Sequence, residues 1–325
     1  MIILRDDEIN TFTAKASVAT IGVFDGLHRG HQAVIGQVIA HSKEYDARST
    51  VVTFDPSPAM ILAPTRAPRL LATLDQRLEG IEALGVDQVR LLTFNATLAH
   101  ESARHFIERV LVGELRTKGV VVGEDFHFGH NRVGTVATLG EVGAQRGFSV
   151  WPAPLYGDGE RWRSTSVRAA LARGDLEAAR SILGRPFTLR GTVVHGDERG
   201  EELGYPTANL DVAAHQQLPA EGVYAGATTR DGKWWPAAIS VGTRPQFYDH
   251  GELVVEVHVL GFEDDLYDSS LDVVFLARLR AQMKFSNVDE LTAQIELDVV
   301  ETRKIFNKFR PEEPELLGWT LGQRR

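Results

Sequence analysis

The sequence predicts two domains, an N-terminal α/β domain with a doubly wound parallel sheet and a C-terminal antiparallel β-barrel. At 325 residues, the chain is longer than one usual domain. Its first half alternates β-rich and helical stretches, a pattern that implies right-handed crossovers and parallel strands. From Arg185 onward, short strands are separated by turns rich in Gly, Pro and Asp, which is typical of a small barrel. We therefore expect domains at 1–184 and 185–310, followed by a partly disordered tail at 311–325.

The composition argues against several classes of protein. An apolar fraction of 43% is sufficient for two hydrophobic cores. A net charge of -9 argues against a general nucleic-acid-binding protein, which carries an excess of basic residues. Without cysteine the chain has neither disulfides nor thiolate chemistry, and no apolar run reaches the ~20 residues of a membrane span. We expect a cytoplasmic protein with no nucleic-acid or membrane partner.

The first domain is predicted from the order of its elements. β-branched and apolar residues indicate strands at 18–23, 48–54, 88–94 and 119–122. Apolar residues at helical intervals indicate helices at 27–41, 74–84 and 99–111, and Gly85 is placed to end the second of them. Because the carboxyl ends of parallel strands form one edge of the sheet, we expect ligand-binding residues at that edge.

The chain then continues with helices expected at 167–173 and 176–183. Between them, Arg173-Gly174-Asp175 spells an adhesion tripeptide, but a glycine that ends one helix and an aspartate that caps the next explain it fully. We assign it no function. The expected strands of the barrel are 187–195, 222–229, 234–241, 253–262 and 271–277, and a helix at 288–307 closes it.

A buried strand, a glycine turn and two histidines follow one another in VATIGVFDGLHRGH, at 18–31. The glycines keep backbone bulk away from anything bound at the carboxyl end of the strand. His28 and His31 are three residues apart, so they share a face in the first turn of the expected helix. Amide donors and the positive end of the helix dipole favour an anion there, and a polyphosphate fits. A metal site is the alternative, but the chain has no cysteine and no HExxH-like pattern to complete one.

The motif GVFDGLHRGH resembles the nucleotide-binding signature of the HxGH nucleotidylyltransferases. Within that superfamily it is similar to the G-x-FDG-x-H-x-GH form of bacterial bifunctional riboflavin kinase/FMN adenylyltransferases. The resemblance runs from the first strand to the last helix. It implies that His28 and His31 are catalytic residues of FMN adenylylation. It further implies that the nucleotide is bound by Gly22, Phe24, Asp25 and Gly30.

Two further stretches carry the same resemblance. GEDFHFG at 123–129 is similar to the family's G-E-[ND]-F-x-FG loop, which implies a nucleotide contact by Asp125; the alternative is a surface turn anchored by its aromatic residues. STSVR is similar to the S-[ST]-x-x-R element, in which Ser164, Thr165 and Arg168 would lie against the triphosphate. Ordinary N-capping by the hydroxyls is the alternative. With the two histidines, this helix start would complete a phosphate cradle.

The second half resembles riboflavin kinases, and the resemblance implies their six-stranded barrel. GYPTAN at 204–209 is similar to their G-[FY]-PTAN element, and GVY at 222–224 to their GVY strand. The hydroxyl of Thr207 and the amide oxygen of Asn209 are hard, neutral ligands suited to a magnesium ion that also binds ATP phosphates. Glu256 matches the glutamate proposed as general base toward the ribityl hydroxyl, although alternation alone would make it part of a half-solvated strand. Nucleotide or flavin contacts are implied for Gly191, Gly204, Thr207 and Asn209.

The sequence departs from the family pattern at several positions. Ser57 stands where a histidine is usual, which removes one donor to the nucleotide phosphates. Arg244 and Gln246 lie in a loop that commonly reads GTNPTF, and Glu201 stands where a basic residue is common. These departures bear on nucleotide affinity and on the flavin loop more than on the reaction type.

The resemblance implies two reactions with ATP as co-substrate: phosphorylation of riboflavin to FMN, and adenylylation of FMN to FAD with release of pyrophosphate. Riboflavin, FMN, FAD and ATP are the expected ligands, and Mg²⁺ is the expected cofactor. Two alternatives stay open: only the kinase half is active, because Ser57 lies in the other half, or the chain is a non-catalytic flavin- or nucleotide-sensing protein. The sequence does not choose between a monomer and a weak homo-oligomer.

Overall fold

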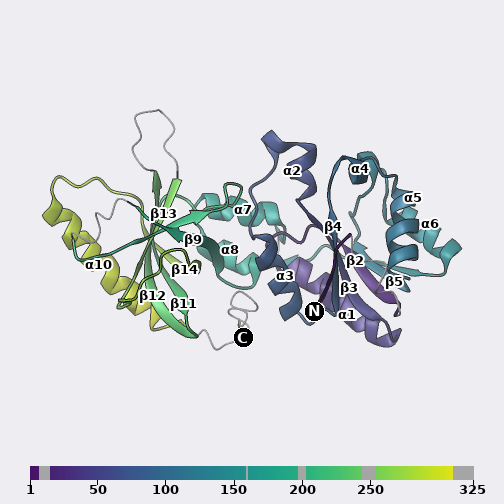
Figure 1. Cartoon of the computed structure of the whole chain (residues 1–325), viewed down its shortest axis with the longest axis horizontal. Coiled ribbons are helices and arrows are strands. Elements are labelled where there is room, and N and C mark those ends of the chain that lie inside the picture. Colours follow the sequence, from purple (N-terminus) through teal and green to yellow (C-terminus); the bar gives the residue numbers. More distant parts are fainter. Residues whose placement is uncertain (7–14, 159, 197–202, 244–252, 310–325) are drawn as a thin grey trace. The chain divides into compact units, whose positions relative to one another are not determined.

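The computed structural model describes residues 1–6, 15–158, 160–196, 203–243 and 253–309. Contacts divide the chain into two compact units, which can be followed by colour along the sequence in Figure 1. The first unit comprises Met1–Arg69 and Leu74–Arg163, and the second comprises Leu70–Thr73 and Ser164–Arg325. The predicted order, an α/β domain followed by a barrel, is confirmed.

The first unit is built on a six-stranded parallel sheet. Its strands are β1 (Ile2–Leu4), β2 (Ser17–Ile21), β3 (Arg48–Asp55), β4 (Gln88–Thr93), β5 (Gly119–Gly123) and β6 (Ser149–Ala153). They are arranged in the order β1-β4-β3-β2-β5-β6, and every neighbouring pair is parallel. Helices cover both faces: Val18 of β2 packs with Val38 of one helix, whereas Ala19 packs with Leu139 of another. The predicted doubly wound sheet is therefore confirmed.

The helical segments of this unit depart from the prediction in one region. We expected one helix at 99–111, but the chain forms two short helices and a π-helical segment there. Asn95 accepts a hydrogen bond from the N–H of Leu98 at 3.0 Å, and Ser102 accepts one from His105 at 3.2 Å. Each cap starts a new helix. The segments are α1 (Arg29–Glu44), α2 (Pro58–Leu62), η2 (Pro64–Arg66), α3 (Leu74–Ala83), α4 (Ala96–Ala99), α5 (Ala103–Phe106), η3 (Ile107–Glu114, π-helical), η4 (His130–Arg132) and α6 (Val136–Arg146).

The strand order reverses between β2 and β5. The chain runs outward from β2 through β3 to β4, and then returns to β5 on the other side of β2. Ligands of open α/β sheets bind outside the carboxyl ends of the strands at such a reversal. The glycine turn that follows β2 and the loop that follows β5 flank this point, and a small ribbon of β7 (Gly157–Asp158) and β8 (Glu160–Arg161) ends the unit.

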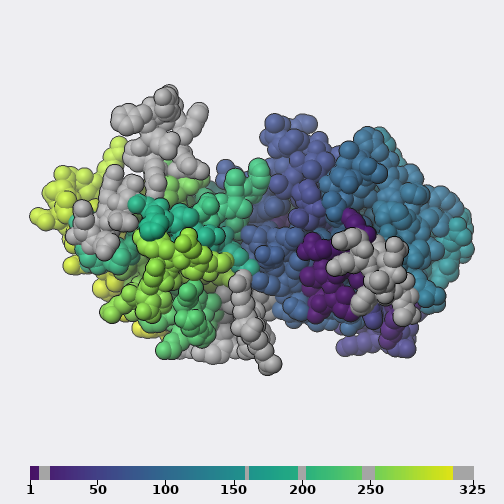
Figure 2. Space-filling model, viewed as in Figure 1, coloured from purple at the N-terminus to yellow at the C-terminus, as the bar shows by residue number. Residues whose placement is uncertain are grey.

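The second unit is a closed antiparallel barrel with the order β10-β13-β12-β11-β14-β9. Its strands are β9 (Phe187–Val194), β10 (Ala208–Val212), β11 (Gly222–Arg230), β12 (Lys233–Thr243), β13 (Leu253–Val259) and β14 (Ser270–Arg280). The implied six strands are confirmed, although composition alone did not reveal β10. Helix α10 (Val288–Phe306) contacts β11, β12 and β14, and its yellow atoms lie at the surface in Figure 2.

Two helices precede the barrel, α7 (Ser164–Ala172) and α8 (Leu176–Leu183). Gly174 has a φ of +71°, and Asp175 accepts a hydrogen bond from the N–H of Ala178 at 3.0 Å, so the helix stop and cap explain the adhesion tripeptide. We expected both helices in the first domain, which was to end at 184. Instead, their apolar faces pack into the barrel core, and contacts divide the chain at 163/164. In the part of the chain that the structure describes, no helix is both long and apolar enough to cross a membrane.

Candidate functional site

His28 and His31 lie together at the start of α1. His28 is the N-cap residue, and its Nδ1 accepts a hydrogen bond from the backbone N–H of His31 at 3.3 Å. The two rings stack with their centroids 3.6 Å apart, and the ring of Phe24 contacts His31 edge-on at 5.2 Å. The predicted common face is confirmed. Because Nδ1 of His28 accepts, its Nε2 carries the proton and can donate to a phosphate oxygen.

His31 is uncharged at neutral pH. Burial, and then the neighbouring His28, lower the pKa of His31 well below its usual range. Its Nδ1 is buried and has no hydrogen-bond partner among the described residues. A buried polar atom without a partner costs free energy that a bound ligand can recover. His31 therefore offers hydrogen bonds to a ligand rather than a fixed positive charge.

The glycines of the motif make room for side chains of the site. A Cβ at Gly22 would lie 3.1 Å from the Phe24 ring, and one at Gly30 would lie 3.1 Å from the His28 ring. Phe24 has a φ of 54°, in the left-handed region that a bulky residue rarely adopts. Asp25, the next residue, is buried at 4% exposure. A strained, buried turn of this kind is typical of a functional segment.

Asp125 follows β5 on the other side of the strand reversal. Its carboxylate is exposed and lies 3.7 Å from the guanidinium of Arg163. Phe126 and Phe128 stack with centroids 5.3 Å apart, and both pack against the core between the sheet and α6. The structure therefore uses the two rings as anchors that present Asp125 at the tip of the loop.

The predicted hydroxyl-and-arginine element forms the start of α7 in the second unit. Ser164 and Arg168 are half-buried and Thr165 is exposed. Because the histidines belong to the first unit and this helix to the second, the joint phosphate cradle stays a prediction.

Several residues of the first unit were missed by sequence reasoning. Arg77 of α3 is buried and donates hydrogen bonds to the segments around the glycine turn. Arg29 lies over the ring of Trp162, 5.3 Å from its centroid, and Arg163 pairs with Asp125. Arg163 directly precedes STSVR and could have been noticed there. Nothing in the local pattern of α3 distinguishes Arg77 from a solvated helix residue.

The barrel brings two predicted residues face to face. Asn209 on β10 is paired directly with Glu256 on β13, and Glu256 is paired on its other side with Ser240 of β12. Directly opposed side chains have Cβ atoms about 5 Å apart. Asn209 is 6% exposed, and a Cβ at Gly196 would clash with its amide, so the backbone of Gly196 covers it. Val255 is buried in the barrel, so Glu256 lies on the opposite face, as the alternation predicted.

A histidine that the sequence reasoning did not single out ties this pair to the PTAN turn. Nδ1 of His258 lies 2.7 Å from the carbonyl oxygen of Pro206, and its ring contacts Tyr205 edge-on. Burial lowers the pKa of His258, as does Arg303 of α10, while the bond to Pro206 opposes them. Nδ1 therefore donates to the carbonyl in the neutral ring. The turn that carries Thr207 is held on β13 beside Glu256.

The predicted magnesium ligands fit a partly hydrated ion. Thr207 and Asn209 supply a hydroxyl and an amide oxygen, and Glu256 adds a carboxylate opposite Asn209. Mg²⁺ usually keeps several waters and binds few protein ligands together with substrate phosphates. Across the described ranges, no group of three or more His, Cys, Asp or Glu side chains could hold a metal alone. The donor set therefore suits an ion that arrives with ATP.

Two predicted glycines serve the barrel in different ways. A Cβ at Gly191 would lie 2.5 Å from the carbonyl oxygen of Asp211, so close strand packing requires this glycine. Gly204 has a φ of +79° and opens the PTAN turn. Direct contacts of either glycine with a nucleotide or flavin stay predictions. Of the departures from the family pattern, Ser57 is buried before α2, whereas Glu201, Arg244, Gln246 and the tail lie outside the described residues.

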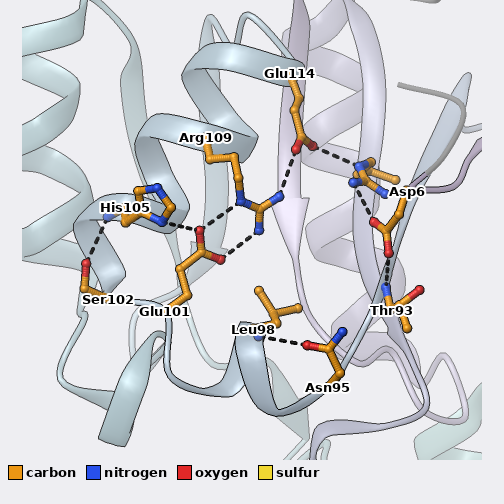
Figure 3. Close-up of polar contacts among 10 residues, drawn as sticks. Asp6, Thr93, Asn95, Leu98, Glu101, Ser102, His105, Arg109 and Glu114 are labelled. Carbon is orange, nitrogen blue, oxygen red and sulfur yellow. Dashed lines mark hydrogen bonds and ion pairs between the residues drawn. The ribbon is translucent and has the colours of Figure 1, made fainter. Parts of the chain in front are cut away.

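A cleft of about 720 Å³ lies at the end of β4 beside α4 and α5, and Figure 3 shows the polar contacts among residues of its wall. Glu101 pairs with Arg109 at 2.7 Å and with His105 at 2.7 Å, and Arg109 also reaches Glu114. The wide turn of the π-helical segment lets Arg109 and Glu114, five residues apart, meet. Each ionic group of this wall already has an opposite partner. The wall therefore stabilises the edge of the sheet and offers no uncompensated charge to a ligand.

Comparisons with known proteins bear on both halves. Residues 11–166 match the FAD synthetase family and residues 183–306 match the riboflavin kinase family. The chain is 40% identical over 292 residues to a bifunctional riboflavin kinase/FMN adenylyltransferase of Pseudomonas fluorescens, which covers 90% of this chain and 93% of that relative. It is 38% identical over 296 residues to the protein of the same name from Escherichia coli strain K12, at 90% and 94% coverage.

A solved structure agrees over the same length. A chain from Streptococcus pneumoniae, described as a macrolide-efflux protein, superimposes with a TM-score of 0.83 and 30% identity, covering 93% of this chain and 99% of that one. The two family matches occur in the same order as the parallel sheet and the barrel, and they include the motifs on β2, β10 and β13. The chain belongs to the family of bifunctional riboflavin kinase/FMN adenylyltransferases.

Proposed function

We propose that this chain phosphorylates riboflavin to FMN with ATP and then adenylylates FMN to FAD with a second ATP. One observation carries the proposal: each unit that matches a family domain brings together the residue pair that the resemblance implies for that domain, His28 with His31 in the first unit and Asn209 with Glu256 in the second. A chain with only one active half would not need both.

In the barrel, the terminal ribityl hydroxyl of riboflavin attacks the γ-phosphorus of ATP. The new O–P bond forms as the bond to the bridging oxygen of ADP breaks, and Glu256 accepts the hydroxyl proton. Thr207 and Asn209 would hold the Mg²⁺, which would neutralise phosphate charge, while Gly191 and Gly204 shape the flavin and nucleotide contacts. A carboxylate on a strand of a closed barrel is more rigidly placed than one on a loop, which supports Glu256 in this role.

In the first unit, a phosphate oxygen of FMN attacks the α-phosphorus of ATP, and pyrophosphate leaves. The protein supplies no nucleophile, so its contribution is alignment and stabilisation of charge. His28 and His31 donate hydrogen bonds to the phosphates, and Ser164, Thr165 and Arg168 add a hydroxyl and guanidinium clamp. Nucleotide contacts come from Gly22, Phe24, Asp25, Gly30 and Asp125.

The two half-reactions are measured separately with the full chain. With riboflavin, ATP and Mg²⁺, we expect ADP and FMN; with supplied FMN, ATP and Mg²⁺, we expect FAD and pyrophosphate. Loss of the second reaction alone would favour a kinase-only protein, in which Ser57 replaces a needed donor. Flavin binding without consumption of ATP in either assay would favour a sensing protein and would overturn the proposal.

Other expectations from the sequence remain proposals. A cytoplasmic location rests on the absence of cysteine from the 325 residues, and the lack of a nucleic-acid partner rests on the net charge of -9. Two further expectations are proposals as well: the chain has no membrane partner, and it forms a weak homo-oligomer.

A further inference from the structure

Arg77 on α3 is a buried arginine that connects the glycine turn to the neighbouring strand. Its side chain is 3% exposed. One terminal nitrogen donates to the carbonyl oxygen of Val23 at 2.7 Å and also reaches the hydroxyl of Thr53 at 3.4 Å. The other donates to the carbonyl oxygen of Phe54 at 3.2 Å. The planar fork therefore joins the turn after β2 to the end of β3.

Two carboxylates compensate the charge of this buried guanidinium. Asp55 lies 3.9 Å from it, and the electrostatic attraction of Asp25 also acts on it. Burial lowers the pKa of Arg77, and the two aspartates oppose that shift. An arginine stays protonated in this setting, so its charge is retained within the wall of the site. The contacts of Arg77 therefore join the turn that carries the predicted nucleotide-binding residues Phe24 and Asp25 to the carboxyl end of β3.

The turn that Arg77 holds is the strained part of the site. The last backbone hydrogen bond of the β2–β3 pairing is the one that the N–H of Gly22 donates to the carbonyl oxygen of Val52 at 3.0 Å. Beyond that point, Phe24 adopts a left-handed φ of 54°, and the chain then enters α1, whose N-cap residue is His28. A strained segment keeps its conformation only where surrounding contacts determine it. The bond from Arg77 to Val23 is such a contact.

We infer that Arg77 is a positioning residue for adenylyl transfer. By holding the Val23–Asp25 turn against the end of β3, it fixes the position of the His28–His31 pair that follows the turn. The inference rests on the proposed role of the two histidines. It assigns Arg77 no contact with substrate. Lysine keeps the charge but cannot donate to two carbonyls in a fixed plane, so Arg77→Lys is not a neutral exchange.

The test compares Arg77→Lys and Arg77→Met with Arg90→Met in the full chain. Arg90, on β4 of the same unit, is a matched control because it is a second buried arginine, at 1% exposure, and is paired with Asp6 and Glu114, which are not predicted site residues. For each variant, kcat and the KM for ATP are measured for FAD formation from FMN. Riboflavin phosphorylation by the same preparation reports on the other half, and thermal unfolding gives the folded fraction.

We expect Arg77→Met to lower kcat for FAD formation about 100-fold per folded molecule, since small misplacements of aligned groups have effects of this size. Arg77→Lys should lie between Arg77→Met and the unmodified chain, and Arg90→Met should retain kcat per folded molecule. Riboflavin phosphorylation should be unchanged in all three. If Arg77→Met does not fold, the kcat of Arg77→Lys for FAD formation tests the inference instead.

A kcat of Arg77→Lys equal to that of the unmodified chain would overturn the inference, as would equal losses per folded molecule in Arg77→Met and Arg90→Met. Failure of the unmodified chain to form FAD would instead overturn the proposed function, so the two failures are distinguishable.

Discussion

Asn209 and Glu256 are paired directly across β10 and β13, on the face of the barrel wall opposite the buried Val255. A neutral amide oxygen and a carboxylate thus lie side by side, although they are 47 positions apart in the sequence and the strands β11 and β12 lie between them along the chain. An ion that binds the amide would bring its phosphates to the residue that accepts the proton.

The first prediction concerns the carboxylate. Glu256→Gln keeps the size of the side chain but removes its ability to accept a proton, so FMN formation should fall by about 10²- to 10⁴-fold. FAD formation from supplied FMN should be retained, because it takes place in the other unit. Chromatographic separation of flavins measures both. Glu263→Gln, an exposed site beyond β13, is the control, and an equal loss of both reactions in Glu256→Gln would contradict the assignment.

The second prediction concerns the amide. Asn209→Leu retains a similar volume but removes the oxygen, so riboflavin phosphorylation should require more Mg²⁺ and show a higher KM for ATP. Asn209→Asp keeps an oxygen ligand and should retain more activity at low Mg²⁺. Titration of the initial rate with Mg²⁺ distinguishes them. Identical titrations for the two variants would show that this oxygen does not bind the ion.

The third prediction concerns the two histidines, whose loss should impair the other reaction. His28→Ala combined with His31→Ala removes both imidazoles at the start of α1, so FAD formation should fall by at least about 100-fold, while riboflavin phosphorylation continues. His41→Ala, at the other end of the same helix, controls for loss of a histidine from α1. Normal FAD formation in the double variant would reject the assignment of the first unit.

The fourth prediction concerns acid stability. The pKa of His31 in the folded chain lies well below the 6.5 of an exposed histidine, so the unfolded chain binds a proton that the folded chain does not. The contribution of His31 to stability is therefore complete above pH 6.5 and declines as the pH falls below it. In His31→Asn, the melting temperature should fall less steeply with decreasing pH. Equal slopes in the two proteins would contradict this coupling.

The fifth prediction concerns the cleft at the end of β4. Glu101→Gln leaves Arg109 with one carboxylate instead of two, so the first unit should lose about 1–3 kcal/mol of stability. Neither reaction should change per folded molecule, because the ionic groups of this wall compensate one another. Chemical denaturation and both activity assays measure this. Loss of FAD formation without loss of stability would instead make this cleft part of the active site.

The sequence was informative where chemistry is local. The strand, turn and helix start of 18–31 could be predicted because their residue types determine backbone conformation, whereas the PTAN stretch was singled out only through its resemblance to riboflavin kinases. The sequence was less informative where tertiary contacts determine the helix boundaries and the core into which a helix packs. The region 99–111 has one apolar periodicity, yet capping by Asn95 and Ser102 breaks it into separate helices. Helices α7 and α8 were expected in the first domain, but their apolar faces join the barrel core.

Residues outside any motif were missed for a related reason. Arg77 shows no local sign of burial, and His258 follows Glu256 on an alternating strand as any half-solvated residue would. Each acts through a backbone carbonyl of a distant segment, Val23 or Pro206. Such contacts depend on how the elements pack, which periodicity and motif spacing do not specify.

The central claim is that one polypeptide carries both activities, and a time course from riboflavin tests it most directly. The full chain is incubated with riboflavin, excess ATP and Mg²⁺, and the flavins are resolved by chromatography at intervals. We expect FMN to form first and then to decline as FAD and pyrophosphate accumulate. FMN that accumulates without conversion to FAD, or riboflavin that remains unchanged, would contradict the account.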